Sequence, residues 1–152
     1  MRALGVDWGT VRIGLATCDP GGVLASPYGT IDQVRDLPRV RRDIARIVAD
    51  EEVEVVVVGH PLSLDGSRGP AALAVEAQAA ALAEVLPVPV VLHDERLTTV
   101  TAHRLLGASG MDGRQRRRVV DRAAAAVLLQ TWLDGGSPTH LTAASLPPPP
   151  EE

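Results

Sequence analysis

Hydrophobic and polar positions along the 152-residue chain first follow a strand pattern and then alternate between helix and strand patterns. Alternating or apolar runs broken by turn residues predict three strands with short connections, over residues 3–6, 12–18 and 23–31. Two later runs predict further strands, over residues 53–58 and 88–93. Apolar positions at helical spacing predict four helices, over residues 34–50, 70–86, 98–106 and 116–133.

This order of elements predicts an α/β fold. Three strands joined by short turns form an antiparallel meander, and the later strands join it in parallel through right-handed crossovers. The expected result is a mixed five-stranded sheet with helices on both faces. Pro27 and Pro89 suit edge or bulge positions, because proline cannot donate to a strand ladder. Residues 1–136 are expected to form one domain, and residues 137–152, with four consecutive prolines, a disordered tail.

Composition narrows the class of protein. The length allows one domain with a proper core and not two. Hydrophobic residues make up 45% of the chain and aromatic residues only 2%, so alanine, valine and leucine must fill the core. A single cysteine, Cys18, excludes an intrachain disulfide and a site of several thiols. With neither a signal-peptide pattern nor an apolar run of about 18 residues, the expected location is the cytoplasm, away from membranes.

The distribution of charged residues along the chain changes what the net charge indicates about nucleic-acid binding. A net charge of −4 argues against a protein that coats nucleic acid. However, all fifteen basic residues are arginine, and ten of them lie in residues 35–46 and 114–122. The first cluster is typical of a solvated helix face, whereas the second surrounds Asp121. The protein is therefore expected to present a basic rim to phosphates while being acidic overall.

Three acidic residues fall where α/β sheets gather ligands, beyond the carboxyl ends of strands. Asp7 follows the first strand, Glu95 follows the last one, and Asp121 shares a helix face with small apolar residues. Each has a simpler interpretation: a turn residue, a surface pair with Arg96, or a pair with an arginine one turn earlier in the helix. Together they form an all-oxygen set, which suits Mg²⁺ or Mn²⁺ rather than zinc.

Four blocks of sequence carry a family resemblance, in residues 5–16, 58–66, 94–99 and 120–130. In these blocks the chain resembles the YqgF family, also called RuvX, of candidate pre-16S rRNA nucleases; the Asp-Glu-Arg-Leu-Thr-Thr block at 94–99 is the most specific. The resemblance implies a ribonuclease H-like fold related to Holliday junction resolvases. It also implies that the catalytic, metal-binding acids correspond to Asp7, Glu95 and Asp121.

Two departures from the family pattern are modest. The last helix often has a lysine shortly before its acid, where this chain has three arginines at 116–118, so charge is preserved. The middle helix commonly carries a phenylalanine where this chain has alanines, which affects packing and not the site.

Several other residues are candidates for supporting roles. The predicted phosphate contacts are Arg12, Arg96, Arg117 and Arg118, since a guanidinium matches phosphate oxygens in a bidentate manner. Arg12 could equally be a solvated turn residue, and Arg96 could instead orient Glu95. His60 ends a buried strand, where a hydrogen-bonded structural role is favoured over that of a general base.

The leading hypothesis is a metal-dependent nuclease with a two-metal-type mechanism that processes the 5′ end of pre-16S rRNA. The alternatives are a Holliday junction resolvase-like endonuclease, which normally requires a symmetric dimer, and a non-catalytic nucleic-acid-binding module. Structured RNA or branched DNA is the expected partner, and the oligomeric state stays open between a monomer and a weak homodimer. The Asp-x-Gly-Thr pattern at 7–10 also occurs in actin-like and sugar-kinase ATPases, but those need two such domains, which this length excludes.

Overall fold

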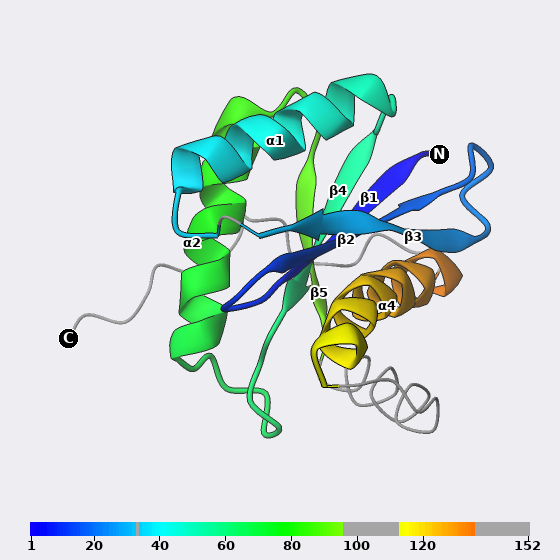
Figure 1. The fold of residues 1–152 in the computed structure, drawn as a ribbon. Coiled ribbons are helices and arrows are strands. Elements are labelled where there is room, and N and C mark those ends of the chain that lie inside the picture. The colour runs from blue at the N-terminus through cyan, green and yellow to red at the C-terminus, as the bar shows by residue number, and fades with distance from the viewer. Residues whose placement is uncertain (33, 96–112, 136–152) are drawn as a thin grey trace.

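A computed structural model describes residues 1–32, 34–95 and 113–135, with the side chains of 113–122 outside the description. Its elements in chain order are β1 (Ala3–Trp8), β2 (Ile13–Cys18), β3 (Ala25–Ile31), α1 (Leu37–Asp50), β4 (Val55–His60), α2 (Pro70–Val85), β5 (Val90–Asp94) and α4 (Gly113–Asp134). The strands form one sheet in the order β3-β2-β1-β4-β5 (Figure 1). β1, β2 and β3 pair antiparallel, whereas β1, β4 and β5 pair in parallel. The predicted mixed five-stranded sheet is confirmed, and the helix expected over 98–106 lies outside the described residues.

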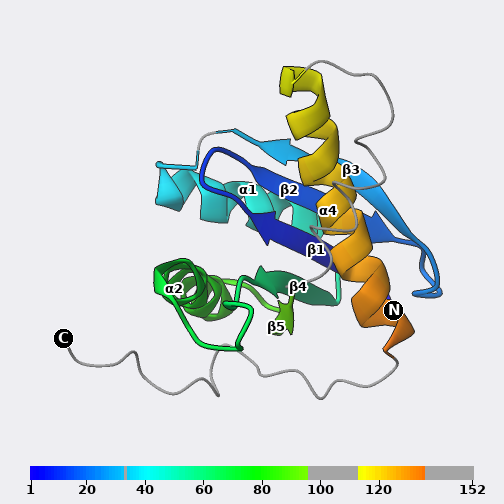
Figure 2. The same ribbon diagram turned by 90° about the horizontal axis from the view of Figure 1, so that it is seen from below.

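Helices cover both faces of the sheet, as predicted (Figures 1 and 2). The side chains of β4 alternate between two cores: Val56 and Val58 pack with residues of α1 and α2, and Val55 and Val57 pack with residues of α4. α4 lies close to the sheet at Gly5, where an added Cβ would lie 2.9 Å from Leu129 Cβ. A glycine in β1 therefore lets α4 lie directly on the sheet.

Two predicted boundaries were wrong for local reasons. β1 does not end at residue 6, because its pairing with β2 continues through Asp7 and Trp8. α1 begins at Leu37 rather than 34, because the side chain of Asp36 caps it by accepting the Arg39 N–H at 3.2 Å. Both corrections matter for the site, since Asp7 lies inside a strand and Arg35 lies before the helix rather than in it.

The two prolines lie where the missing N–H group costs least. β3 is an edge strand, and Pro27 pairs with Ala16 at a shift in the register between β2 and β3. Pro89 directly precedes the other edge strand, β5, and its carbonyl accepts the Val56 N–H at 3.0 Å. The expectation of an edge or bulge position is confirmed for Pro27, and Pro89 borders an edge strand without being part of it.

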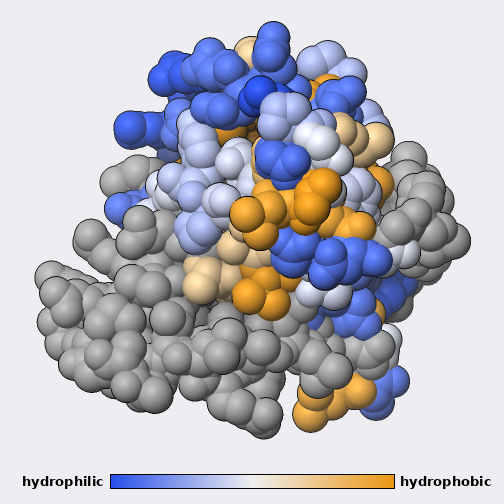
Figure 3. All heavy atoms as spheres, turned by 90° about the vertical axis from the view of Figure 1, so that its right-hand side faces the viewer, coloured by the Kyte–Doolittle hydropathy of each residue, from blue (hydrophilic) through white to orange (hydrophobic). Residues whose placement is uncertain are grey.

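The face that carries the N-terminus displays apolar side chains (Figure 3). Met1, Val23 and Leu24 are exposed there, next to the β2–β3 turn that Asp19 holds through the backbone N–H groups of Val23 and Leu24. This turn lies at the amino end of β1, opposite the end where Asp7 lies.

None of the helices in the described ranges is both long and apolar enough to span a membrane.

Candidate active site

Three strands end at one edge of the sheet, because β1, β4 and β5 run in the same direction. Asp7 lies near the carboxyl end of β1, and Glu95 follows Asp94, the last residue of β5. β4 lies between these two strands and ends at His60, which pairs with Asp94. The structure thus brings Asp7 and Glu95 to the same edge, on either side of β4.

Both acids lie on the side of the sheet that α4 covers. Side chains alternate along a strand, and Gly5, two residues before Asp7, faces α4. On β4, Gly59 lies beneath Glu95: a Cβ at this position would come within 3.1 Å of Glu95 Cδ and within 3.1 Å of Leu128 Cδ2. Glycine at position 59 therefore leaves the space that the Glu95 carboxylate occupies.

The surroundings of Glu95 are acidic. The pKa of Glu95 is raised to about 9. The largest cause is burial, followed by the charge of Asp7, a side-chain hydrogen bond with Asp7 and the charge of Asp94. Two carboxylates held this close cannot both be charged without a large electrostatic cost, so a proton or a cation must lie between them. The pair is therefore a site for positive charge.

The turn after β1 is too tight for any residue but glycine at its first position. The Gly9 N–H donates to the Arg12 carbonyl at 3.0 Å, and a Cβ at Gly9 would lie 2.5 Å from that oxygen. The turn holds Arg12 with its Nε 3.9 Å from Asp32 Oδ1 and its side chain 16% exposed. Arg12 thus lies at the same sheet edge as Asp7, largely covered rather than solvated.

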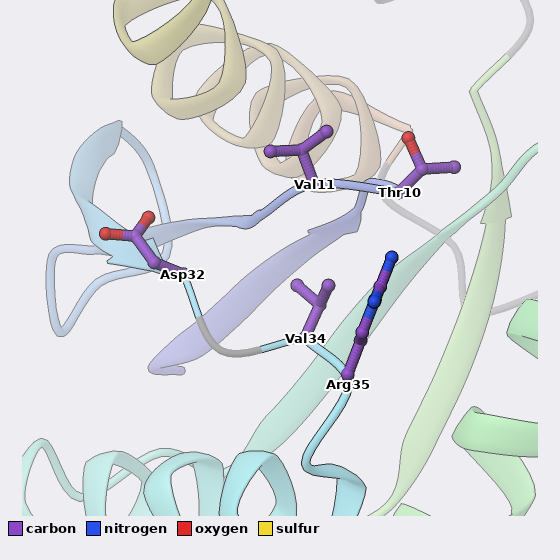
Figure 4. Close-up of a pocket in the computed structure, with 5 residues that line it drawn as sticks. All are labelled: Thr10, Val11, Asp32, Val34 and Arg35. Carbon is purple, nitrogen blue, oxygen red and sulfur yellow. The ribbon is translucent and has the colours of Figure 1, made fainter.

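A hollow of about 260 Å³ lies next to this turn (Figure 4), lined by Thr10, Val11, Asp32, Val34 and Arg35. Arg35 extends from the segment before α1 toward the Thr10 end of the hollow (Figure 4). The periodicity of the sequence had grouped Arg35 with the solvated face of a helix. The structure places Arg35 before the helix, exposed and lining this hollow, and the cap at Asp36 was the signal that could have revealed its place.

His60 faces the opposite side of the sheet, toward α2. Its Nε2 lies 2.7 Å from Glu76 Oε2, and both side chains are buried. Arg68 also binds the Glu76 carboxylate, with its Nε 3.0 Å from Oε2. His60 is therefore the hydrogen-bonded histidine that was favoured. Glu76 and Arg68 were not predicted, although a glutamate in the middle of an alanine-rich helix, flanked by Val75 and Ala77, was a visible signal.

The remaining predicted site residues lie partly or wholly outside the description. Arg96 is among the undescribed residues, and Asp121, Arg117 and Arg118 lie in α4 with side chains that are not described. Asp121 precedes Ala125 by about one helical turn, and the Ala125 carbonyl lies 3.1 Å from the Cβ that Gly5 would carry. In residues 1–32, 34–95 and 123–135, no three metal-binding side chains gather at one point, so the contribution of Asp121 stays a prediction.

The chain matches one protein family along nearly its whole length. The profile of the RuvX family, described as Holliday junction resolvase, matches residues 1–135. A protein of Streptomyces avermitilis, named as a candidate pre-16S rRNA nuclease, is 49% identical over 134 residues, which are 88% of this chain and 85% of that protein. A protein of Mycobacterium leprae with the same name is 48% identical over 134 residues, 88% of this chain and 72% of the relative.

Among solved structures, the chain is similar to Thermus thermophilus RuvC, with a TM-score of 0.56 and 14% identity. The match covers 93% of this chain and 99% of that one. A structure of the same protein in complex with a Holliday junction substrate matches equally well. At this identity the likeness shows the fold alone, and it confirms the expected ribonuclease H-like architecture.

Proposed function

The chain belongs to the RuvX family of Holliday junction resolvases, and we propose that it is a divalent-metal-dependent nuclease that processes the 5′ end of pre-16S rRNA. The observation that carries the proposal is the pair formed by Asp7 and Glu95 over Gly59. Open α/β sheets bind ligands beyond the carboxyl ends of their strands, and carboxylate oxygens are the ligands that divalent cations such as Mg²⁺ take. The names of the relatives supply the substrate class.

The residues present fit Mg²⁺ or Mn²⁺. Burial and, after it, the charge of Asp7 raise the pKa of Glu95, and a bound cation would offset the cost of charging this carboxylate. Asp7 and Glu95, with Asp121 as the third acid, would hold one or two such ions. Bound there, the metal supplies a water of lowered pKa and offsets charge on the phosphate.

The protein's own groups orient the substrate around this pair. Arg12, which follows the tight turn at Gly9 and lies at the same sheet edge as Asp7, would bind a phosphate oxygen of the substrate. Arg35 offers a second cation at the neighbouring hollow. Arg96, Arg117 and Arg118 complete the proposed set of phosphate contacts. Because Asp7 lies inside the β1–β2 ladder, its main chain is held rigidly, which favours an ordered reaction geometry.

The test is cleavage of a 5′-labelled RNA that spans the mature 5′ end of the small-subunit rRNA precursor, in the presence of Mn²⁺. The protein should cut this RNA, and Asp7→Asn should remove the activity, while the control Asp50→Asn at the exposed end of α1 should retain it. Equal cutting by Asp7→Asn would refute the assignment. RNA binding without cutting, combined with no Mn²⁺ binding, would identify a non-catalytic binding module instead.

The likeness to RuvC favours one second candidate, cleavage of four-way DNA junctions. The same preparation can be offered a labelled junction in parallel with the RNA. Paired symmetric cuts by a dimeric protein would favour junction resolution, whereas sedimentation as a monomer would count against it.

A further inference from the structure

The buried carboxylate of Glu76 connects three separate parts of the molecule. Glu76 is 7% exposed and lies in α2, among alanines and other apolar residues. Its Oε2 is 2.7 Å from His60 Nε2 at the end of β4. The same carboxylate accepts from Arg68, which lies in the loop between β4 and α2, with Nε 3.0 and 3.2 Å from its two oxygens. One carboxylate thus fixes a strand end, a loop and a helix to one another.

This arrangement is more than a general contribution to packing. A buried charge is costly unless its partners satisfy it, and here Arg68 and His60 do so. The hydrogen bond from Arg68 holds the pKa of Glu76 below its usual range, so the carboxylate stays charged. A fully satisfied buried carboxylate is rigid, and it fixes the positions of the side chains that it binds.

His60 connects this network to the proposed active site on the other face. Its side chain is held by Glu76, and its main-chain carbonyl accepts the Glu95 N–H at 3.3 Å. In the β4–β5 ladder His60 pairs with Asp94, the residue before Glu95. The residue before His60 is Gly59, which lies beneath the Glu95 carboxylate. The last two residues of β4 therefore contact Glu95 through its main chain and its side chain.

We propose that Glu76 is a positioning residue for Glu95: by holding His60, it sets where the Glu95 carboxylate lies relative to Asp7, and thereby the affinity of the site for a divalent cation. The part of the proposal that concerns the cation rests on the proposed nuclease function. The link from Glu76 to Glu95 does not, because it is made of contacts within the protein.

The first experiment measures this link in metal-free protein. The backbone amide resonance of Glu95 is recorded by ¹⁵N-resolved NMR in the wild type, in Glu76→Gln and in two controls. Glu84→Gln changes an exposed glutamate of the same helix, and Val48→Ala removes two buried methyl groups in α1, away from His60. The Glu95 amide should shift in Glu76→Gln and in neither control, even though Val48→Ala lowers the unfolding temperature.

The second experiment measures Mn²⁺ affinity by calorimetry and cleavage kinetics on the same four proteins. Partners that orient metal ligands typically change metal affinity by about 10- to 100-fold, so Glu76→Gln should weaken Mn²⁺ binding by about tenfold. The value of kcat should fall at subsaturating Mn²⁺, while KM for the RNA stays within about twofold, because the phosphate contacts are intact. Val48→Ala should retain the Mn²⁺ affinity of the wild type.

The outcomes separate the two proposals. An unmoved Glu95 amide, or equal Mn²⁺ affinities in Glu76→Gln and Val48→Ala, overturns the positioning role. If the Glu95 amide shifts in Glu76→Gln but the wild-type protein neither binds Mn²⁺ nor cuts RNA, the nuclease function is overturned while the link from Glu76 to Glu95 stands. If Glu76→Gln does not fold, Arg68→Lys takes its place. This change replaces the bidentate guanidinium, whose side chain is 25% exposed, with an ammonium group that cannot bind both Glu76 oxygens in the same way. The Glu95 amide and the Mn²⁺ affinity should then change in the same direction as in Glu76→Gln, but by less.

Discussion

Two glutamates near the same edge of the sheet have opposite environments. Glu76, on the α2 side, meets Arg68 and His60, and the hydrogen bond from Arg68 lowers its pKa. Glu95, on the α4 side, meets Asp7 and Asp94, and burial together with these acids raises its pKa to about 9. The same side chain is thus satisfied on one face and in electrostatic conflict on the other.

The difference distinguishes the face whose charges are already paired from the face of the proposed active site. A carboxylate that already has cationic partners offers nothing to a ligand, whereas two carboxylates side by side create a demand for positive charge. Strained electrostatics persist only where the surrounding structure compensates for them, and they are concentrated at functional sites. The network of Glu76 on the opposite face contributes to that compensation, because Glu76 holds His60 and the His60 main-chain carbonyl accepts the Glu95 N–H.

The largest expected effect comes from filling the space beneath Glu95. Gly59→Ala adds a methyl group where Glu95 and Leu128 already lie, so the carboxylate must move. A displacement of about 1 Å in a catalytic group can cost about 100-fold in rate, and a loss of that order in kcat is expected for RNA cleavage.

The matched control is Gly29→Ala in β3, where an added Cβ meets nothing within 4 Å. That variant should cut RNA at the wild-type rate. If Gly59→Ala also cuts at the wild-type rate, the Glu95 carboxylate does not need the position that the structure gives it.

A second prediction uses pH to test the conflict at Glu95. Between about pH 4.5 and 9 the folded, metal-free protein keeps a proton on Glu95 that the unfolded chain releases, so stability falls as pH rises through this window. Glu95→Gln removes this dependence. In EDTA at pH 8 the variant should be more stable than the wild type by at least about 1 kcal/mol, because a shift of one pKa unit is worth about 1.4 kcal/mol. Urea unfolding at pH 5 and pH 8 measures the difference.

Saturating Mn²⁺ should reduce or reverse the advantage of Glu95→Gln, because a bound cation stabilises the charged pair in the wild type. An equal stability of the two proteins in EDTA at both pH values would show that Glu95 carries no such conflict.

Glu76 should respond to pH in the opposite sense. Its lowered pKa means that the folded state gains stability from the charged carboxylate above about pH 4.5 and loses it as pH falls through the folded-state pKa. In Glu76→Gln this acid-induced loss should be smaller by about 1.5 kcal/mol, the lower end of the range for a hydrogen bond to a charged group. Acid titration followed by circular dichroism, with Glu84→Gln as the control, measures it.

The smallest effect concerns the outer rim of the site. Arg35→Gln should weaken RNA binding modestly and reduce the slope of log affinity against log salt by about 0.7–0.9, the value for one phosphate contact. Arg46→Gln, on the exposed face of α1, should leave that slope unchanged. Filter binding of RNA to catalytically inactive Asp7→Asn protein measures both. Equal slopes for the two variants would show that Arg35 does not contact a phosphate and that the RNA binds only on the α4 side of this sheet edge.

Much of the fold followed from hydrophobic alternation, because a strand in a layered sheet must divide its side chains between two cores, as 55–58 do. The ends of elements did not follow from it. β1 continues through Asp7 because of its partner β2, and α1 begins late because of a cap at Asp36. Periodicity describes faces, whereas ends depend on hydrogen bonds with other parts of the chain.

The site was predictable only in part, for a similar reason. Asp7 and Glu95 could be selected because each lies directly after, or one residue after, an apolar run that predicts a strand. The contact between Glu76 and His60 could not, since nothing local shows which residue of α2 faces the end of β4. The role of Gly59 was hidden as well, because it depends on a side chain 36 residues further along the chain.

The position of β5 in the sheet has a consequence for local opening. β5 lies at an edge and is paired along one side with β4, whereas β1 is held between β2 and β4. The free energy of detaching β5 should therefore be lower than that of opening β1, and amide hydrogen exchange should be faster at Leu92 than at Val6. Glu95 follows the strand that opens more easily and Asp7 lies on the one that stays closed, so a cation binding both would tie the edge strand to the centre of the sheet.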